Sequence, residues 1–142
     1  MSEVLAGLRE ELKGRWPQAV LSQKNLKACV AQAGINHPGD LYLARAAFLG
    51  ESWAQLALEE EVFLPVRERL ARQYNRVQAD EAVQGTREQL LVLKPGLGAY
   101  AGRGPLKTWV LVIATRKLVS QQERRHESLG QTALADSTDS AR

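Results

Sequence analysis

Cysteine and histidine are scarce in this sequence. Its 142 residues include one cysteine, Cys29, and two histidines, His37 and His126. A single cysteine excludes an internal disulfide, and a thiolate nucleophile would need one of the two histidines as its base. Cys29 falls at an apolar helical position and His37 in a loop, so we expect core packing for the first and no role for the second. The sequence therefore predicts no catalytic residue, metal or other cofactor, and a chain that is not an enzyme.

Long apolar runs and strand-like alternation are also missing. No stretch of about 18 apolar residues occurs, and the N-terminal segment MSEVLAGLREELKGRW is charged where a signal peptide would be apolar. We expect no membrane segment and a cytoplasmic protein. Because 44% of the residues are hydrophobic, the chain can bury one core. The sequence predicts an all-α fold, a compact bundle of about five or six helices.

Apolar residues recur at helical spacing between candidate caps, glycines and prolines. Ser2, Ser22 and Asp40 can cap the first three helices, and Pro65 would interrupt or kink the fourth. The predicted helices span residues 2–14, 22–34, 40–50, 52–74, 79–94 and 105–125. The turn-rich loop 35–39 predicts a boundary between an N-terminal helical extension, 1–38, and a helical domain, 39–125. Residues 126–142 are polar and lack periodicity, which predicts a disordered tail.

The acidic triplet Glu59-Glu60-Glu61 precedes several arginines. Pairing of this triplet with Arg67, Arg69 and Arg72 on a solvent-exposed surface is the expected arrangement. Adjacent carboxylates can also form an acid/base site, but no pocket signature accompanies these.

Positive charge is concentrated between Tyr100 and Arg125. This stretch holds six basic residues and only Glu123 as an acid, a net charge of +5 against +3 for the whole chain. Clustered lysines and arginines suit an anionic partner such as phosphate, and the alternative is a solvated helix face. The cluster consists of Arg103, Lys107, Arg116, Lys117, Arg124 and Arg125.

The turn Gly102-Arg103-Gly104 leads into this basic helix, with Pro105 at its start. A nucleotide-binding loop does not fit, because Leu106 stands where that motif needs glycine before Lys107 and because Pro105 lacks an amide donor. Tyr100 and Trp109 are candidate stacking platforms for bases. The register of Trp109 with Leu106 and Ile113 favours core packing instead.

Three motifs together resemble a known family. They are Asp40-Leu41-Tyr42-Leu43-Ala44, Asp80-Glu81-Ala82-Val83-Gln84-Gly85-Thr86, and Tyr100-Ala101-Gly102-Arg103-Gly104-Pro105-Leu106 followed by Trp109 and Ile113-Ala114. From about Asp40 to Arg125 the chain resembles region 2 of bacterial RNA polymerase sigma factors, in the extracytoplasmic-function type of the sigma-70 family. The third motif is the most specific, because its aromatic residue, glycine turn, tryptophan and basic helix rarely coincide.

The resemblance implies two binding surfaces. In such sigma factors the helix with the Asp-Glu motif lies on the clamp helices of the largest subunit of core RNA polymerase. The corresponding residues here are Asp80, Glu81, Gln84, Arg87 and Glu88. The glycine turn and basic helix approach promoter DNA near the −10 element, which assigns DNA binding to the six basic residues named above. An anti-sigma protein is a further candidate partner.

Two departures from the family pattern bear on function. Gly85 and Arg87 stand where the family usually has an acidic residue and an apolar aromatic one. The helix-turn-helix of region 4, which reads the −35 element, is missing. We therefore expect a truncated sigma-factor-like module that binds polymerase and −10 DNA. The alternative is a helical protein-interaction or regulatory module, derived from a sigma factor, that no longer recognises DNA.

Overall fold

The computed structural model describes the backbone of residues 2–136 and the side chains of residues 3–127. The fold is all-α, as predicted. A π-helical turn, Glu59–Phe63, joins α4 to α5 without a break, and a short 3₁₀ turn, Gly96–Ala99, precedes the last helix. The α-helices are α1 (Ser2–Arg15), α2 (Gln23–Ala28), α3 (Pro38–Phe48), α4 (Ser52–Leu58), α5 (Leu64–Gln73), α6 (Arg76–Leu91) and α7 (Leu106–Asp136).

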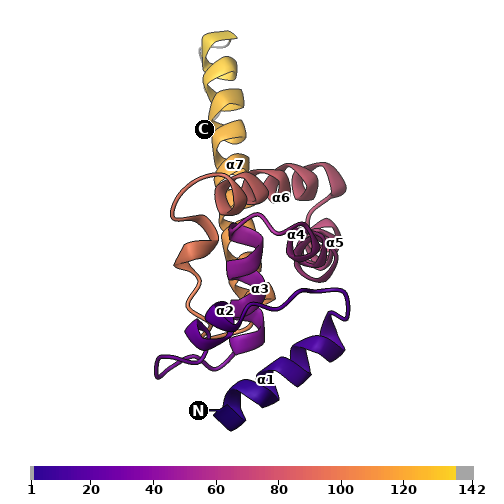
Figure 1. Cartoon of the computed structure of the whole chain (residues 1–142). Helices are drawn as coiled ribbons and strands as arrows, with labels where there is room; N and C mark the ends of the chain where they lie inside the picture. The colour runs from indigo at the N-terminus through magenta and orange to yellow at the C-terminus, as the bar shows by residue number, and fades with distance from the viewer. Residues whose placement is uncertain (1, 137–142) are drawn as a thin grey trace.

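The long helix α7 is the axis of the arrangement (Figure 1). Helix α6 crosses it and packs against both α7 and α5, while α3 contacts α7 and α4. Four residues of α7 at four-residue spacing, Leu106, Val110, Ala114 and Leu118, are buried. This spacing keeps one stripe of the helix against the core and leaves the opposite side free. The C-terminal part of α7 projects beyond the other helices (Figure 1).

The N-terminal helices share the core of the rest of the chain. Leu5, Leu8 and Leu12 of α1 and Leu26 of α2 belong to the same hydrophobic cluster as the buried residues of α3 and α7. Helix α1 contacts α2 and α3 at the end of the molecule away from α6 (Figure 1). The proposed division at residue 38 therefore falls inside one continuous core, next to the first residue of α3.

Helix starts follow the capping signals only in part. The Ser22 hydroxyl accepts a hydrogen bond from the Asn25 N–H at 3.2 Å, as predicted, but α2 ends at Ala28. Asn75 caps α6 by accepting from the Gln78 N–H at 2.8 Å, so α6 begins earlier than residue 79. Asp80 and Glu81 consequently lie beyond the first turn, outside the strongest influence of the helix dipole.

Pro65 does not break the helix that contains it. The π-helical turn precedes it, and the Leu64 N–H bonds the carbonyl of Glu59, five residues earlier. Pro65 is the second residue of α5 and follows this widened turn directly. The wider turn thus accommodates the proline that the sequence predicted would interrupt or kink the helix.

Helix α7 continues past the predicted start of a disordered tail. Its backbone is helical to Asp136, whereas the sequence placed the end of the helix at Arg125. That predicted boundary is too early, and residues 137–142 of the predicted tail lie outside the described part of the chain.

Among residues 2–136, no helix combines the length and the apolar character needed to cross a membrane.

Candidate nucleic-acid interface

The start of α7 is capped by a residue from a distant helix. The Asp40 Oδ2 atom accepts a hydrogen bond from the Leu106 N–H at 2.8 Å. The expectation that Asp40 caps its own helix is wrong, because α3 begins before it, with His37 at the cap position and Pro38 in the first turn. A carboxylate at the N-terminus of a helix is favoured by the free N–H groups and by the helix dipole. Asp40 thereby fixes the origin of the basic helix against α3.

The glycine turn before α7 is held through its backbone. Gly102 has a φ of 75°, and its carbonyl accepts hydrogen bonds from the N–H groups of Asn36 and His37 at 2.9 and 2.8 Å. The Tyr100 hydroxyl donates to the Gly104 carbonyl, and Asn36 Nδ2 donates to the Arg103 carbonyl at 3.3 Å. The main chain on both sides of Arg103 is therefore fixed, while its side chain is exposed.

A hollow of about 530 Å³ lies beside this turn. Arg103, Trp109, Ile113 and Arg116 line it together with Tyr100. Trp109 packs against the core as its register predicted, with its ring centroid 5.3 Å from that of Tyr100, yet it is only half-buried and borders the hollow. Tyr100 is buried, so it cannot serve as an open stacking platform. Burial, and then the nearby Asp40 carboxylate, raise the pKa of the Tyr100 phenol.

A second hollow, the α6–α7 groove, runs between those helices. It measures about 320 Å³, and Arg116, Lys117 and Arg124 line one side of it. Gly85 and Gln89 of α6 form the opposite side. A Cβ atom at Gly85 would lie 3.4 Å from Lys117 Cδ, so a larger side chain there would fill the groove. The glycine that departs from the family pattern is thus part of a basic surface.

Four of the six predicted DNA-binding residues border the two hollows, and two do not. Arg103 lines the hollow beside the turn, Lys117 and Arg124 line the α6–α7 groove, and Arg116 borders both. Lys107 is exposed but lines neither of them. Arg125 differs from the others, because its Nη2 atom lies 2.9 Å from Glu81 Oε1. Among the described side chains, the other five have no carboxylate within ion-pair distance.

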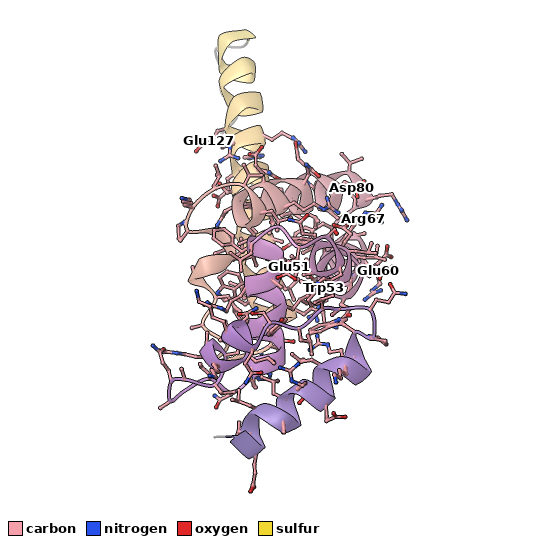
Figure 2. All side chains as sticks on the ribbon, in the orientation of Figure 1. Glu51, Trp53, Glu60, Arg67, Asp80 and Glu127 are labelled. Atoms are coloured by element: carbon pink, nitrogen blue, oxygen red, sulfur yellow. The ribbon has the colours of Figure 1, made fainter. Side chains whose placement is uncertain are left out.

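The five predicted polymerase-binding residues lie on one side of α6. Their positions, i, i+1, i+4, i+7 and i+8, share a helical face. Asp80 pairs with Arg67 of α5 (Figure 2), and this hydrogen bond lowers the pKa of the Asp80 carboxyl.

Arg87 donates to both carboxylate oxygens of Glu59, with Nε at 2.8 Å, and to Gln84 Oε1 at 2.9 Å. The Glu59 hydrogen bonds raise the pKa of the Arg87 guanidinium. Gln84 and Glu88 are exposed.

The expected pairing of the acidic triplet is wrong. Glu59 binds Arg87 of α6, and Glu61 binds Arg15 of α1 at 3.0 Å. Arg67 binds Asp80 and its neighbour Glu68 instead. Pairs that link different helices depend on how those helices pack, so local spacing could not identify them. Glu60 points outward (Figure 2), in keeping with its exposed position.

Among the described side chains, no group of three histidine, cysteine, aspartate or glutamate residues is placed to hold a metal ion. Comparison with protein-family models, curated proteins and solved structures gives no match.

Proposed function

We propose that this chain is a cytoplasmic, non-enzymatic sigma-factor-like module that acts in transcription initiation. Its glycine turn and α7 bind promoter DNA near the −10 element. Its α6 face binds the clamp helices of core RNA polymerase. The proposal rests on the family resemblance of residues 40–125, and the arrangement of charges in the structure supports it.

One observation carries the nucleic-acid part of the proposal. Four cations without a carboxylate partner among the described side chains border two hollows along α7, and Arg116 belongs to both. A basic path of this kind suits a phosphate backbone, and the half-buried Trp109 beside it offers one aromatic edge to a base. The four cations are Arg103, Arg116, Lys117 and Arg124.

The alternative is a protein-interaction or regulatory module that no longer recognises DNA. One observation favours it: Tyr100 is buried and Trp109 packs against it, which leaves little open aromatic surface for unpaired bases. On this alternative, the α6 face would bind a protein partner while the basic path remained only a solvated surface.

A DNA titration separates the two functions. The double variant Arg103→Ala/Lys107→Ala is compared with the parent on single-stranded and forked −10 oligonucleotides, by fluorescence anisotropy across a salt series. We expect weaker binding and a weaker salt dependence. The negative slope of log K against log salt should decrease in magnitude by about 0.7 for each single-strand phosphate that the variant no longer neutralises. The control is Lys24→Ala/Lys27→Ala, which removes two exposed cations of α2 and should leave both quantities near those of the parent. Equal affinity of the parent and the Arg103/Lys107 variant would remove these residues from the site.

A pull-down with core RNA polymerase tests the α6 face. The triple variant Asp80→Ala/Glu81→Ala/Gln84→Ala removes three exposed side chains while leaving the buried Val83 and Thr86 in place. Binding by the parent that the variant loses would support the polymerase surface. Polymerase binding without DNA binding would favour the regulatory alternative, and binding to neither partner would contradict both functions.

A further inference from the structure

Arg15, at the end of α1, is connected to the start of α7 through a single carboxylate. Its Nη1 atom lies 3.0 Å from Asp40 Oδ1. The other oxygen of Asp40 accepts the Leu106 N–H at 2.8 Å. The last residue of α1 and the first residue of the basic helix thus share one partner, although they are distant in sequence.

Arg15 is itself held on several sides. Its Nη2 and Nε atoms donate to Glu61 Oε1 at 3.0 and 3.3 Å. The indole N–H of Trp16 donates to the second Glu61 oxygen at 2.6 Å, and the guanidinium lies 4.3 Å from the Trp16 ring centroid. A guanidinium anchored by a carboxylate and an aromatic face loses little further freedom when it binds a second carboxylate. Arg15 is therefore a rigid support for Asp40.

Helix α1 also approaches α3 unusually closely at this point. A Cβ atom on Gly39 would lie 3.2 Å from Leu12 Cδ2 and 3.3 Å from Arg15 Nη1. Glycine at this position lets the end of α1 reach Asp40. The loop just before α3 contains Asn36 and His37, whose N–H groups donate hydrogen bonds to the Gly102 carbonyl.

We propose that Arg15 is a positioning residue for the nucleic-acid surface, an inference that rests on the proposed function. By orienting Asp40, Arg15 fixes the first N–H of α7 and with it the turn that presents Arg103. By pairing with Asp40, it also offsets a negative charge that would otherwise lie at the base of a phosphate-binding surface. The N-terminal helix, which lies outside the family resemblance, thereby acts on DNA binding without contacting DNA.

The test compares Arg15→Gln with Lys13→Gln in the full chain. Both remove one positive charge from the last turn of α1, but only Arg15 contacts Asp40. Amide hydrogen exchange of Leu106 and anisotropy with a single-stranded −10 oligonucleotide are measured for each. We expect Arg15→Gln to speed exchange at Leu106, with core amides such as that of Leu43 unchanged, and to weaken DNA binding at least threefold more than Lys13→Gln.

Arg15→Lys completes the design. Lysine keeps the charge but cannot donate to Asp40 and Glu61 with a planar fork, so we expect partial recovery of both quantities, and this variant serves if Arg15→Gln does not fold. DNA affinity and Leu106 exchange equal to those of Lys13→Gln would overturn the inference. A parent that binds no oligonucleotide contradicts the proposed function, and with it the role of Arg15 in DNA binding. Leu106 exchange then decides only whether Arg15 positions Asp40 and the start of α7.

Discussion

Single polar side chains in this molecule each serve two structural elements. Glu61 receives Arg15 and Trp16 on its two oxygens, and Arg87 joins Glu59 to Gln84. Partly exposed pairs of this kind contribute at most about 1 kcal/mol each. Their main effect is therefore on geometry, since they determine where one helix meets another while the buried apolar residues supply most of the stability.

Gly102 is the residue whose replacement should have the clearest local effect. Its φ of 75° is unfavourable for other residues, and a Cβ there would lie 3.2 Å from Leu41 Cβ. We expect Gly102→Ala to lower the free energy of unfolding by about 1–2 kcal/mol or more, measured by urea denaturation. Gly104→Ala is the matched control, because a Cβ at Gly104 meets nothing within 4 Å. Equal stability of the two variants would contradict this account of the turn.

Sequence patterns predicted many individual residues correctly. Leu12, Leu26 and Cys29 are fully buried as expected, and Ser22 caps its helix. The capping pattern predicts the wrong helix for Asp40, because the N–H group that donates to this carboxylate lies more than sixty positions further along the chain. A carboxylate near the start of a helix fits the local capping pattern in the sequence even when the N–H group that it binds belongs to another helix.

At the scale of elements, α6 stands between the two candidate surfaces. One side carries the residues assigned to polymerase, while Gly85 and Gln89 border the basic groove. The ion pair of Glu81 with Arg125 connects a residue assigned to polymerase with one assigned to DNA. A partner that binds either side of α6 would therefore contact one member of the Glu81–Arg125 ion pair.

Gly85 offers a test of this helix. Glycine in a helix interior costs up to about 1 kcal/mol relative to alanine, and a Cβ at Gly85 meets only flexible side chains, Lys117 at 3.4 Å and Gln121 at 3.9 Å. We expect Gly85→Ala to raise the free energy of unfolding by about 0.5–1 kcal/mol in urea denaturation. Gly7→Ala in α1, where a Cβ meets nothing within 4 Å, should give a similar gain. A clear loss of stability for Gly85→Ala alone would mean that α6 and α7 cannot adjust at their contact.

Element identity was easier to predict than element ends. Helical spacing correctly indicated each long helix, since burial of one apolar face is expressed locally in the sequence. The end of α2 at Ala28 and the π-helical turn at residues 59–63 depend on packing partners that a local pattern does not specify. The candidate site was predictable as a cluster of cations, whereas the separation of Arg125 from the others was not.

At the scale of the whole molecule, one core joins α1 and α2 to the remaining helices. The stability of the basic surface on α7 and that of the N-terminal helices are thus coupled. Burial of groups that ionise at high pH follows from this single core. Burial raises the pKa of the Cys29 thiol to about 11 and also raises the pKa of the Tyr42 phenol.

The stability of the folded chain should consequently decrease at high pH. An unfolded thiol ionises near pH 9.0, whereas the folded chain keeps this proton to about pH 11. The folded state binds more protons in that interval, so the thiol's contribution is complete below pH 9 and is lost as the pH rises towards 11. We expect the urea midpoint to fall between pH 8.5 and 10.5, and Cys29→Ala to reduce that fall. An equally steep fall in Cys29→Ala would exclude this thiol as a cause.

The π-helical turn limits how the length of this chain can vary. It contains one residue more than a regular helix needs, so a deletion within 59–63 would convert it to regular α-helix. Pro65 would then lie in a helix interior, where a proline removes one hydrogen bond and clashes with the preceding turn. The flanking helices would keep their relative orientation, because the widened turn absorbs the extra residue. Glu59 and Glu61 lie inside the turn, so the deletion would also change the angle between the carboxylate that pairs with α6 and the one that pairs with α1. Variants of this protein should accept changes of length in the loops between helices, and not in this uninterrupted helix.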